Sequence, residues 1–250
     1  MGALHAGHER LIQTARGECS VLVVSIFVNP LQFGPTEDYG RYPRALPQDL
    51  DVCEKNDVDF VFAPSVDEMY PMPQHTFIEV ERLGNHLCGK FRPGHFRGVA
   101  TVVLKLLNIV QPHRAYFGEK DMQQLTIIRR MVVDLNLPVT IVGVPTVREP
   151  DGLALSSRNK YLNDEERKAA PALYKALQEA ARRIHSGERQ ASNVQEGALA
   201  VLTAWPVIRV EYFEIVDPYE LQPVGVISGR VRIAAAIWIS ATRLIDNFSA

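Results

Sequence analysis

The segment His5-Ala6-Gly7-His8 places two histidines three residues apart, directly before the helical stretch Glu9 to Arg16. Residues at this spacing share one side of a helix's first turn. The unpaired N–H groups and the positive dipole end of such a turn attract anions such as phosphate, and Gly7 lets the backbone approach a ligand closely. A histidine there can donate a hydrogen bond to charge developing on a phosphoryl group. A metal-binding pair or two surface histidines are the alternatives.

A second candidate site is Gly118-Glu119-Lys120-Asp121, which follows the strand-like segment Arg114 to Phe117. A glycine turn that opens a helix offers backbone amides to phosphate, and the lysine adds a positive point charge. The two carboxylates could orient the lysine or bind ribose hydroxyls. Shortly after them, Gln124 offers both a donor and an acceptor to a small polar substrate. A solvated helix start is the alternative.

Three further segments carry polar side chains that suit small anions. Leu155-Ser156-Ser157-Arg158 places two hydroxyls beside a guanidinium, which fits the non-bridging oxygens of a triphosphate; a capped turn before a helix is the alternative. Asn29 and Gln32 follow an apolar, strand-like run. The loop Phe91 to Gly98 holds two arginines and a histidine, which would clamp a carboxylate or phosphate unless the loop is simply solvated.

These segments must be positioned by the short apolar runs and helical patterns between them. Nearly continuous β-branched runs predict parallel strands buried on both faces, at residues 21–28, 58–62 and 139–144. Apolar residues at i, i+3, i+4 and i+7 predict helices over residues 99–110 and 122–135. This alternation predicts an α/β fold with a Rossmann-like, doubly wound parallel sheet. Ligands of such sheets bind beyond the carboxyl ends of the strands.

The pattern changes at Glu149-Pro150-Asp151-Gly152, a strong turn signal. Beyond it the sequence predicts helices at residues 164–186 and 192–203, followed by strands at residues 209–216 and 231–239. Helices followed by strands, without strand–helix alternation, indicate a small α+β domain. We therefore expect a Rossmann-like domain over residues 1–147 and a smaller C-terminal α+β domain over residues 148–250.

The composition is that of an ordinary globular chain of 250 residues, with 46% hydrophobic and 22% charged residues. A formal net charge of -2 gives no general attraction to nucleic acid or to an anionic membrane. There is no apolar run of 18 residues and no signal-peptide pattern. The three cysteines lack metal-type spacing and indicate reduced thiols. We therefore expect a cytoplasmic protein without nucleic-acid or membrane partners.

Taken in order, several motifs resemble those of the pantothenate synthetase family, the pantoate–β-alanine ligases. They are MGALHAGH, FVNPLQF, RPGHFRGV, FGEKDMQQL, GVPTVRE, DGLALSSRN and TRLIDN, and they extend from residue 1 to about residue 247. H-x-G-H alone is shared with other nucleotidyl-transferring enzymes and with class I tRNA synthetases. Its combination with NPLQF and GEKDxQQ is far more specific.

The resemblance implies an ATP-binding Rossmann-like domain, a smaller C-terminal domain that acts as a cover, and a homodimer. It also implies two chemical steps. The carboxylate of pantoate attacks the α-phosphorus of ATP, giving pantoyl adenylate and pyrophosphate. The amine of β-alanine then attacks the acyl carbon and releases AMP. Mg²⁺ should accompany ATP, and the sequence identifies no protein ligands for it.

Residue roles carry over from the family by position. The ATP-binding residues are Met1, Gly2, Ala3, Leu4, His5, Ala6, Gly7, His8, Gly118, Glu119, Lys120, Asp121, Val147, Leu155, Ser156, Ser157 and Arg158. The catalytic residues are His8 as proton donor, His5 as its partner at the phosphates, and Lys120 and Arg158, which stabilise the transferring phosphoryl group. The residues for pantoate are Gln32 and Gln124, with Asn29 close by and Gln32 also near β-alanine.

The sequence departs from the family at its beginning. In the family a strand ending in Pro-Thr, preceded by a helix, comes before MGALHxGH, whereas this chain begins at that Met. The comparison predicts that the first strand of the parallel sheet is missing, which would expose the edges of its neighbours. Two other readings therefore stay open: a related H-x-G-H nucleotidyltransferase, and an N-terminally truncated homologue that still dimerises but is inactive.

Overall fold

The computed structural model describes residues 1–35 and 37–250, and these fall into two compact units. The first unit comprises Met1–Asn85, Gly89–Glu119 and Gln124–Val147. The second unit comprises His86–Cys88, Lys120–Gln123 and Arg148–Ala250. The second unit thus takes two short pieces from the earlier part of the chain, and one of them contains Lys120 and Asp121.

The first unit has parallel strand pairs, which confirms the predicted α/β class with parallel strands. β1 (Val23–Ser25) pairs with β2 (Phe60–Phe62), and β3 (Arg114–Gly118) pairs with β4 (Thr140–Val144). In the part of the chain that the structure describes, these pairs form two separate two-stranded sheets. β1 is shorter than the predicted 21–28, although the Ile26 N–H still donates to the Phe62 carbonyl beyond the strand's end, at 2.9 Å.

The helices associated with these strands are α1 (Ala6–Glu18), α2 (Leu46–Lys55), α3 (Val66–Met69), α4 (Leu87–Phe91), α5 (His95–Val110) and α6 (Met122–Asp134). Single 3₁₀ turns are η1 (Pro30–Gln32), η2 (Asp38–Gly40) and η3 (Glu119–Asp121). α5 begins four residues before the predicted start. Gly94 has a left-handed backbone (φ 79°), which glycine tolerates best, and its turn starts the helix early.

α1 is fixed by a small apolar core. Ile12 and Ala15 on one face of the helix are 1% and 2% exposed, and they belong to a cluster with Val24 of β1 and Cys53 of α2. Burial of a side chain the size of isoleucine contributes about 1.5–3 kcal/mol. The cluster therefore holds the start of α1, with its two histidines, against β1 and α2.

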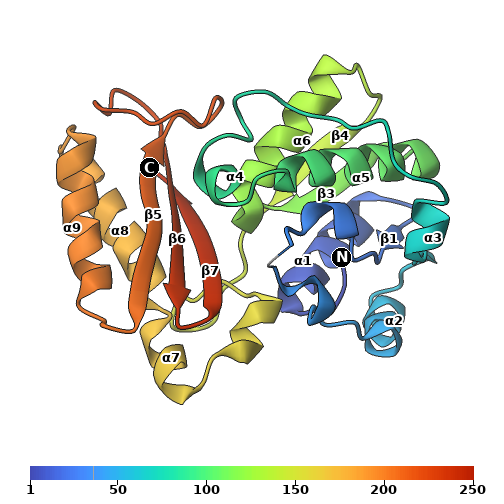
Figure 1. Ribbon diagram of the computed structural model, residues 1–250, viewed down its shortest axis with the longest axis horizontal. Coiled ribbons are helices and arrows are strands. Elements are labelled where there is room, and N and C mark those ends of the chain that lie inside the picture. The colour runs from blue at the N-terminus through green and yellow to red at the C-terminus, as the bar shows by residue number, and fades with distance from the viewer. Residues whose placement is uncertain (36) are drawn as a thin grey trace. The chain divides into compact units, whose positions relative to one another are not determined.

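The second unit carries an antiparallel sheet. Its strands β5 (Ile208–Val216), β6 (Arg232–Ile239) and β7 (Thr242–Ser249) pair in that order. The helices α8 (Ala172–His185) and α9 (Ala191–Thr203) lie beside the sheet in Figure 1. They pack on it through an apolar core. Both strands predicted in this region are present. β7 lies beyond them, in a segment for which the sequence pattern gave no strand.

The single helix predicted over residues 164–186 is wrong, because two helices occupy this stretch. α7 (Asp164–Ala169) ends before Pro171, and α8 begins after it. Proline has no N–H to donate, and its ring clashes with the preceding turn, so a continuous helix is broken there. Asn163 accepts hydrogen bonds from the N–H groups of Glu165 and Glu166 and caps α7, as its sequence position predicts.

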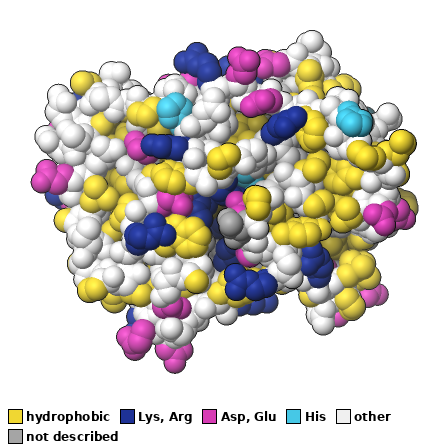
Figure 2. Space-filling model, in the orientation of Figure 1, with side chains coloured by type: hydrophobic (Ala, Val, Ile, Leu, Met, Phe, Trp, Pro, Cys, Tyr) yellow, Lys and Arg dark blue, Asp and Glu magenta, His cyan; other side chains and the backbone are white. Residues whose placement is uncertain are grey.

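Three further features concern hydrophobic helices, surface charge and cysteines. No helix among residues 1–35 and 37–250 is long and apolar enough to cross a membrane. On the face drawn in Figure 2, charged side chains of both signs are scattered among hydrophobic ones. All three cysteines, Cys19, Cys53 and Cys88, are free thiols, in agreement with the prediction of reduced cysteines.

Candidate active site

The two histidines meet at the start of α1. His5 is the N-cap residue and His8 the third helical residue, and their ring centroids are 4.1 Å apart. The Gly7 N–H donates to Nδ1 of His5 at 3.1 Å, and the His5 N–H donates to Nδ1 of His8 at 3.3 Å. Because each Nδ1 accepts, these hydrogen bonds assign the proton of each neutral imidazole to Nε2. The helix start thus carries two imidazole donors close together.

The loop before α1 is held by a residue that the sequence analysis missed. Asp49 of α2 is only 2% exposed, and its carboxylate accepts from the N–H groups of Ala3 (2.9 Å) and Leu4 (2.6 Å). Ala3 adopts a left-handed backbone (φ 50°), which a residue with a Cβ rarely does unless its surroundings hold it. The only sequence signal was an acidic residue four positions before Cys53, on the buried face of α2.

The same loop runs beside the segment that follows β1. The Phe27 N–H donates to the Met1 carbonyl at 3.0 Å, and a Cβ placed on Gly2 would lie 3.7 Å from the Val28 side chain. The next residue is Asn29, followed by η1, which ends at Gln32. The loop that leads to the histidines and the segment that carries the two amides therefore start side by side in the first unit.

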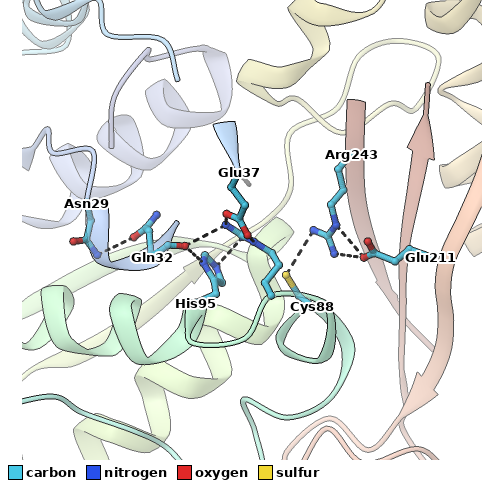
Figure 3. A network of polar contacts seen from close by, with 8 residues as sticks. Asn29, Gln32, Glu37, Cys88, His95, Glu211 and Arg243 are labelled. Carbon is cyan, nitrogen blue, oxygen red and sulfur yellow. Dashed lines mark hydrogen bonds and ion pairs between the residues drawn. The ribbon is translucent and has the colours of Figure 1, made fainter. Parts of the chain in front are cut away.

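Asn29 is a buried hydrogen-bonding centre. Its side-chain Nδ2 donates to the Gly98 carbonyl (3.1 Å) and to Oε1 of Gln32 (3.3 Å), and its Oδ1 accepts from the hydroxyl of Tyr70 (2.8 Å). Burial raises the pKa of Tyr70 to about 12, so this phenol remains a donor at neutral pH. Figure 3 shows Asn29 and Gln32 with their amides directed at each other. These contacts fix the orientation of both amides.

Gly98 lets α5 approach this segment closely. A Cβ built on Gly98 would collide with the backbone of Leu31 and lie 2.7 Å from the Gln32 nitrogen. Neither is the movable end of a side chain, so any larger residue would displace η1. The requirement for glycine at the end of the RPGHFRG motif therefore has a steric cause.

Arg92 from the same motif is neither a solvated side chain nor a clamp awaiting an anion, because a carboxylate of this chain already pairs with it. Its guanidinium makes two hydrogen bonds with Glu37, at 2.8 and 2.5 Å. Burial raises the pKa of Glu37, but the hydrogen bond and the charge of Arg92 outweigh this, and the pKa lies below its ordinary value. Arg97, the second arginine, is exposed and stacks over Phe77, with its guanidinium carbon 3.8 Å from the ring centroid.

The remaining predicted residues of the first unit lie near β3, β4 and α6. Gly118 ends β3, and Glu119 begins η3 with its Oε1 3.2 Å from a Cβ built on Gly143 of β4. Val147 follows β4 and is partly buried. Gln124 lies in the first turn of α6 and is also partly buried.

The glutamine before it, Gln123, has a different environment. Gln123 belongs to the second unit and is 6% exposed; its Oε1 accepts from the Cys88 N–H (3.0 Å) and its Nε2 donates to the His86 carbonyl (2.8 Å). These bonds tie residues 86–88 to α6. Both ends of the Gln123 amide are therefore used in hydrogen bonds to the backbone, which gives Gln123 a structural role.

Lys120 and Asp121 belong to the second unit. The Lys120 ammonium lies 4.0 Å from the Asp121 carboxylate, and the Lys120 carbonyl accepts from the side-chain amide of Asn247 in β7 at 3.0 Å. Asn247 is 6% exposed and was not predicted as a site residue. Its only sequence signal was its place in the TRLIDN motif. The hydrogen bond to the Lys120 carbonyl explains why this buried position of β7 carries an amide side chain.

The Leu155-Ser156-Ser157-Arg158 segment leads into a 3₁₀ turn, η4 (Ser157–Tyr161), which packs against β7. The hydroxyl oxygen of Ser156 accepts from the Arg158 N–H at 3.3 Å, and the Asn159 amide donates to the Ala154 carbonyl at 3.1 Å. The backbone at residues 156–161 therefore forms a capped turn, as the sequence analysis allowed. Within the second unit, both this turn and the Lys120 carbonyl lie next to β7.

Metal ligands are not grouped in the described part of the chain. There, no set of three or more His, Cys, Asp or Glu side chains is arranged to hold a metal ion. A metal that accompanies a nucleotide usually keeps its waters and takes most of its other ligands from phosphates.

Comparisons with known proteins agree with these observations. The family model described as pantoate-beta-alanine ligase matches residues 1–249. The chain is 56% identical to a pantothenate synthetase of Thermosipho africanus, over 99% of this chain and 88% of that protein. It is 54% identical to the pantothenate synthetase of Moorella thermoacetica, over 99% of this chain and 87% of that protein.

Solved structures show the same similarity. A crystal structure of pantothenate synthetase from Thermus thermophilus matches with a TM-score of 0.96 at 50% identity, covering 99% of this chain and 90% of that chain. A pantoate-beta-alanine ligase from Francisella tularensis, complexed with beta-gamma ATP and beta-alanine, matches with a TM-score of 0.82 at 39% identity, covering 99% and 86%. The chain therefore belongs to the pantoate–beta-alanine ligase family.

Proposed function

We propose that this chain joins pantoate to β-alanine through a pantoyl-adenylate intermediate, with ATP consumed and AMP and pyrophosphate released. Ligation of these two acids is the activity of the family to which the chain belongs. The related Francisella tularensis enzyme was crystallised with an ATP compound and beta-alanine. The observation that carries the proposed route is the pair of Nε2–H donors at the start of α1, beside the segment that bears the amides of Asn29 and Gln32.

In the first step, a carboxylate oxygen of pantoate forms a bond to the α-phosphorus of ATP, and the bond from that phosphorus to pyrophosphate breaks. Negative charge grows on the phosphate oxygens in the transition state. The Nε2–H groups of His8 and His5 would donate hydrogen bonds to these oxygens, with the backbone of the first turn of α1 adding its dipole. The hydrogen bonds to each Nδ1 fix the tautomer that this role requires.

In the second step, the amine of β-alanine forms a bond to the acyl carbon, and AMP leaves with the bridging oxygen. The amine loses its proton to solvent. Adenylation has turned a poor leaving group into a good one, so no covalent acyl-enzyme is needed. The task of the chain is to hold the reactants in line, which can contribute several kcal/mol to the barrier reduction.

Pantoate would be held by Gln32 and Gln124, with Asn29 behind them. Because Oε1 of Gln32 accepts from Asn29, its Nε2 is the end that would donate to the substrate. This matches an acid whose carboxylate and hydroxyl oxygens are acceptors. A glutamine whose amide is already oriented also loses less side-chain entropy on binding.

The resemblance assigns the rest of the nucleotide site, and these assignments stay predictions. Besides Met1–His8, they concern Gly118, Glu119, Lys120, Asp121, Val147, Leu155, Ser156, Ser157 and Arg158. Mg²⁺ enters as part of the MgATP substrate, coordinated mainly by phosphate oxygens. The proposal includes the homodimer that the family implies and the cytoplasmic location that the composition predicts.

Exchange of labelled pyrophosphate into ATP tests the route. The purified chain should catalyse exchange only when pantoate is present, because pyrophosphate is released only when the adenylate forms. β-Alanine should not be needed for exchange. Exchange without pantoate, or exchange that requires a nucleotide or a phosphoalcohol instead, would favour an H-x-G-H nucleotidyltransferase and contradict the proposal.

A further inference from the structure

The substrate glutamine Gln32 lies at the end of a chain of charged and polar contacts that the proposed mechanism does not use. We propose that Arg92 is a positioning residue, which, together with Glu37 and His95, fixes the Gln32 segment for binding of pantoate. The inference rests on the proposed assignment of Gln32 to pantoate. All the contacts that support it lie within the first unit.

Arg92 forms a direct hydrogen bond with the backbone of Gln32. Its Nη2 donates to the Gln32 carbonyl at 3.3 Å, while the guanidinium is held by two hydrogen bonds to Glu37. The side chains of Arg92 and Glu37 are 16% and 22% exposed, so solvent weakens their attraction less than that of a surface pair. A planar guanidinium can donate in several fixed directions at once, which a lysine ammonium does not match.

His95 makes the second contact to the same carbonyl. Its Nε2 lies 3.0 Å from Nη1 of Arg92, and its Nδ1 lies 2.8 Å from the Gln32 oxygen. Arg92 can only donate, so Nε2 of His95 accepts, and the proton of the neutral imidazole is on Nδ1, where it donates to Gln32. Figure 3 shows Glu37, His95 and Gln32 gathered at this point. The Gln32 carbonyl thus receives two donors that are themselves held in place.

Gln32 is thereby held at two places. Its carbonyl is fixed by Arg92 and His95, and its side-chain Oε1 by Asn29. Gln32 lies in η1, a single 3₁₀ turn of three residues (Pro30–Gln32), so contacts from outside the turn are needed to hold it in one conformation. If only a fraction of molecules hold the turn in the binding conformation, the apparent dissociation constant rises in inverse proportion to that fraction. Arg92 would therefore act on pantoate affinity without touching pantoate.

Steady-state kinetics of Arg92→Ala test the proposal. We expect the KM for pantoate to rise about tenfold or more, equivalent to about 1.4 kcal/mol, while the KM for ATP stays within about twofold of wild type. Arg97→Ala is the matched control, because Arg97 lies on the same motif but stacks on Phe77. It should leave both constants near wild type. Equal rises of both KM values in Arg92→Ala would indicate a general structural role and overturn the proposal.

Substitutions of His95 examine the donor itself. In His95→Asn the amide nitrogen stands the same number of bonds from the Cα as Nδ1, so it can donate to the Gln32 carbonyl. In His95→Leu, a side chain of similar size, the donor is lost. We expect Asn to keep the pantoate KM within about threefold of wild type and Leu to raise it by at least about tenfold. Indistinguishable Asn and Leu variants would contradict the proposal.

A double-mutant cycle separates this inference from the proposed function. If Arg92 acts through Gln32, adding Arg92→Ala to Gln32→Ala should change the pantoate KM by less than about twofold. An unchanged KM in Gln32→Ala alone would refute the assignment of Gln32 to pantoate, and with it the basis of this inference. A raised KM in Gln32→Ala together with a normal KM in Arg92→Ala would refute only the role of Arg92.

Folding is checked on every variant by circular dichroism and urea unfolding. Should Arg92→Ala fail to fold, Arg92→Lys replaces it, because lysine keeps the charge opposite Glu37 but cannot donate to Glu37 and to Gln32 with the geometry of a guanidinium. The expected result is then a pantoate KM raised by about three- to tenfold. A KM equal to that of wild type in the folded Arg92→Lys variant would overturn the proposal.

Discussion

Asp49 offers a sharp test of how the loop before the histidines is held. In Asp49→Asn, one carboxylate oxygen becomes an NH₂ group that faces a backbone N–H of Ala3 or Leu4. One charge-assisted hydrogen bond becomes a neutral one, at a cost of about 1 kcal/mol, and one buried donor loses its acceptor, at about 1–3 kcal/mol. The site is 2% exposed, so water cannot compensate. We expect a loss of about 2–4 kcal/mol.

Urea unfolding, followed by far-UV circular dichroism, measures this loss, and the melting temperature should fall by roughly 4–16 °C for a chain of this size. Asp51→Asn is the matched control, since Asp51 lies on the same helix with an exposed side chain. Its unfolding free energy should stay within about 0.5 kcal/mol of wild type. The KM for ATP should also rise in Asp49→Asn but not in Asp51→Asn, because only Asp49 holds the loop that leads to His5.

Equal stability and equal ATP kinetics in the two variants would refute this reasoning. A loss of stability with an unchanged KM for ATP would mean that Asp49 stabilises the fold while the loop keeps its conformation by other contacts. Either result would remove Asp49 from the account of the site.

Three further outcomes follow from the geometry. His8→Ala should slow single-turnover adenylate formation about a hundredfold or more, with little change in unfolding free energy, and near-normal adenylation would disprove its role. Gly98→Ala should raise the pantoate KM and cost about 1–3 kcal/mol in urea unfolding, because its Cβ displaces Leu31; a wild-type KM would speak against a fixed Gln32 segment. The lowered pKa of Glu37 means that its ion pair stabilises the fold above the ordinary value of 4.5 and that this stabilisation is lost as pH falls through the folded-state pKa. Glu37→Gln should therefore be less stable than wild type at pH 7, and this difference in unfolding free energy should shrink below pH 4.5; a constant difference would contradict the pairing with Arg92.

The family and the α/β class were predictable because they depend on local patterns. A histidine pair before a helix, strand-like apolar runs and glycine turns each occupy a few consecutive residues, and their order along the chain is specific. The start of α7 also followed from such a signal, because Asn163 caps this helix. The antiparallel strand β7 escaped prediction because buried polar residues, Asp246 and Asn247, interrupt its apolar pattern.

The residues that hold the site were not predictable in the same way, because their partners are far away in sequence. Asp49 contacts residues 45 and 46 positions before it, and Arg92 pairs with Glu37 across 55 positions. A single sequence carries no signal for such pairs. The motif that contains Arg92 was compatible with a bound anion or with a solvated loop, and in the structure Arg92 pairs with the carboxylate of Glu37.

The break between α7 and α8 was missed for another reason. The prediction of one helix over residues 164–186 did not take account of Pro171, which cannot continue a helix. A rule that ends helices before an interior proline would have given the correct boundary.

The central claim is that the carboxylate of pantoate is activated as an acyl adenylate by this chain. Pantoate labelled with ¹⁸O in its carboxylate, incubated with ATP, β-alanine and the purified protein, tests it most directly by mass spectrometry of the products. The account predicts pantothenate together with AMP that carries one ¹⁸O atom, because the bridging oxygen leaves with the phosphate. Label in inorganic phosphate with release of ADP, or unlabelled AMP, would contradict it.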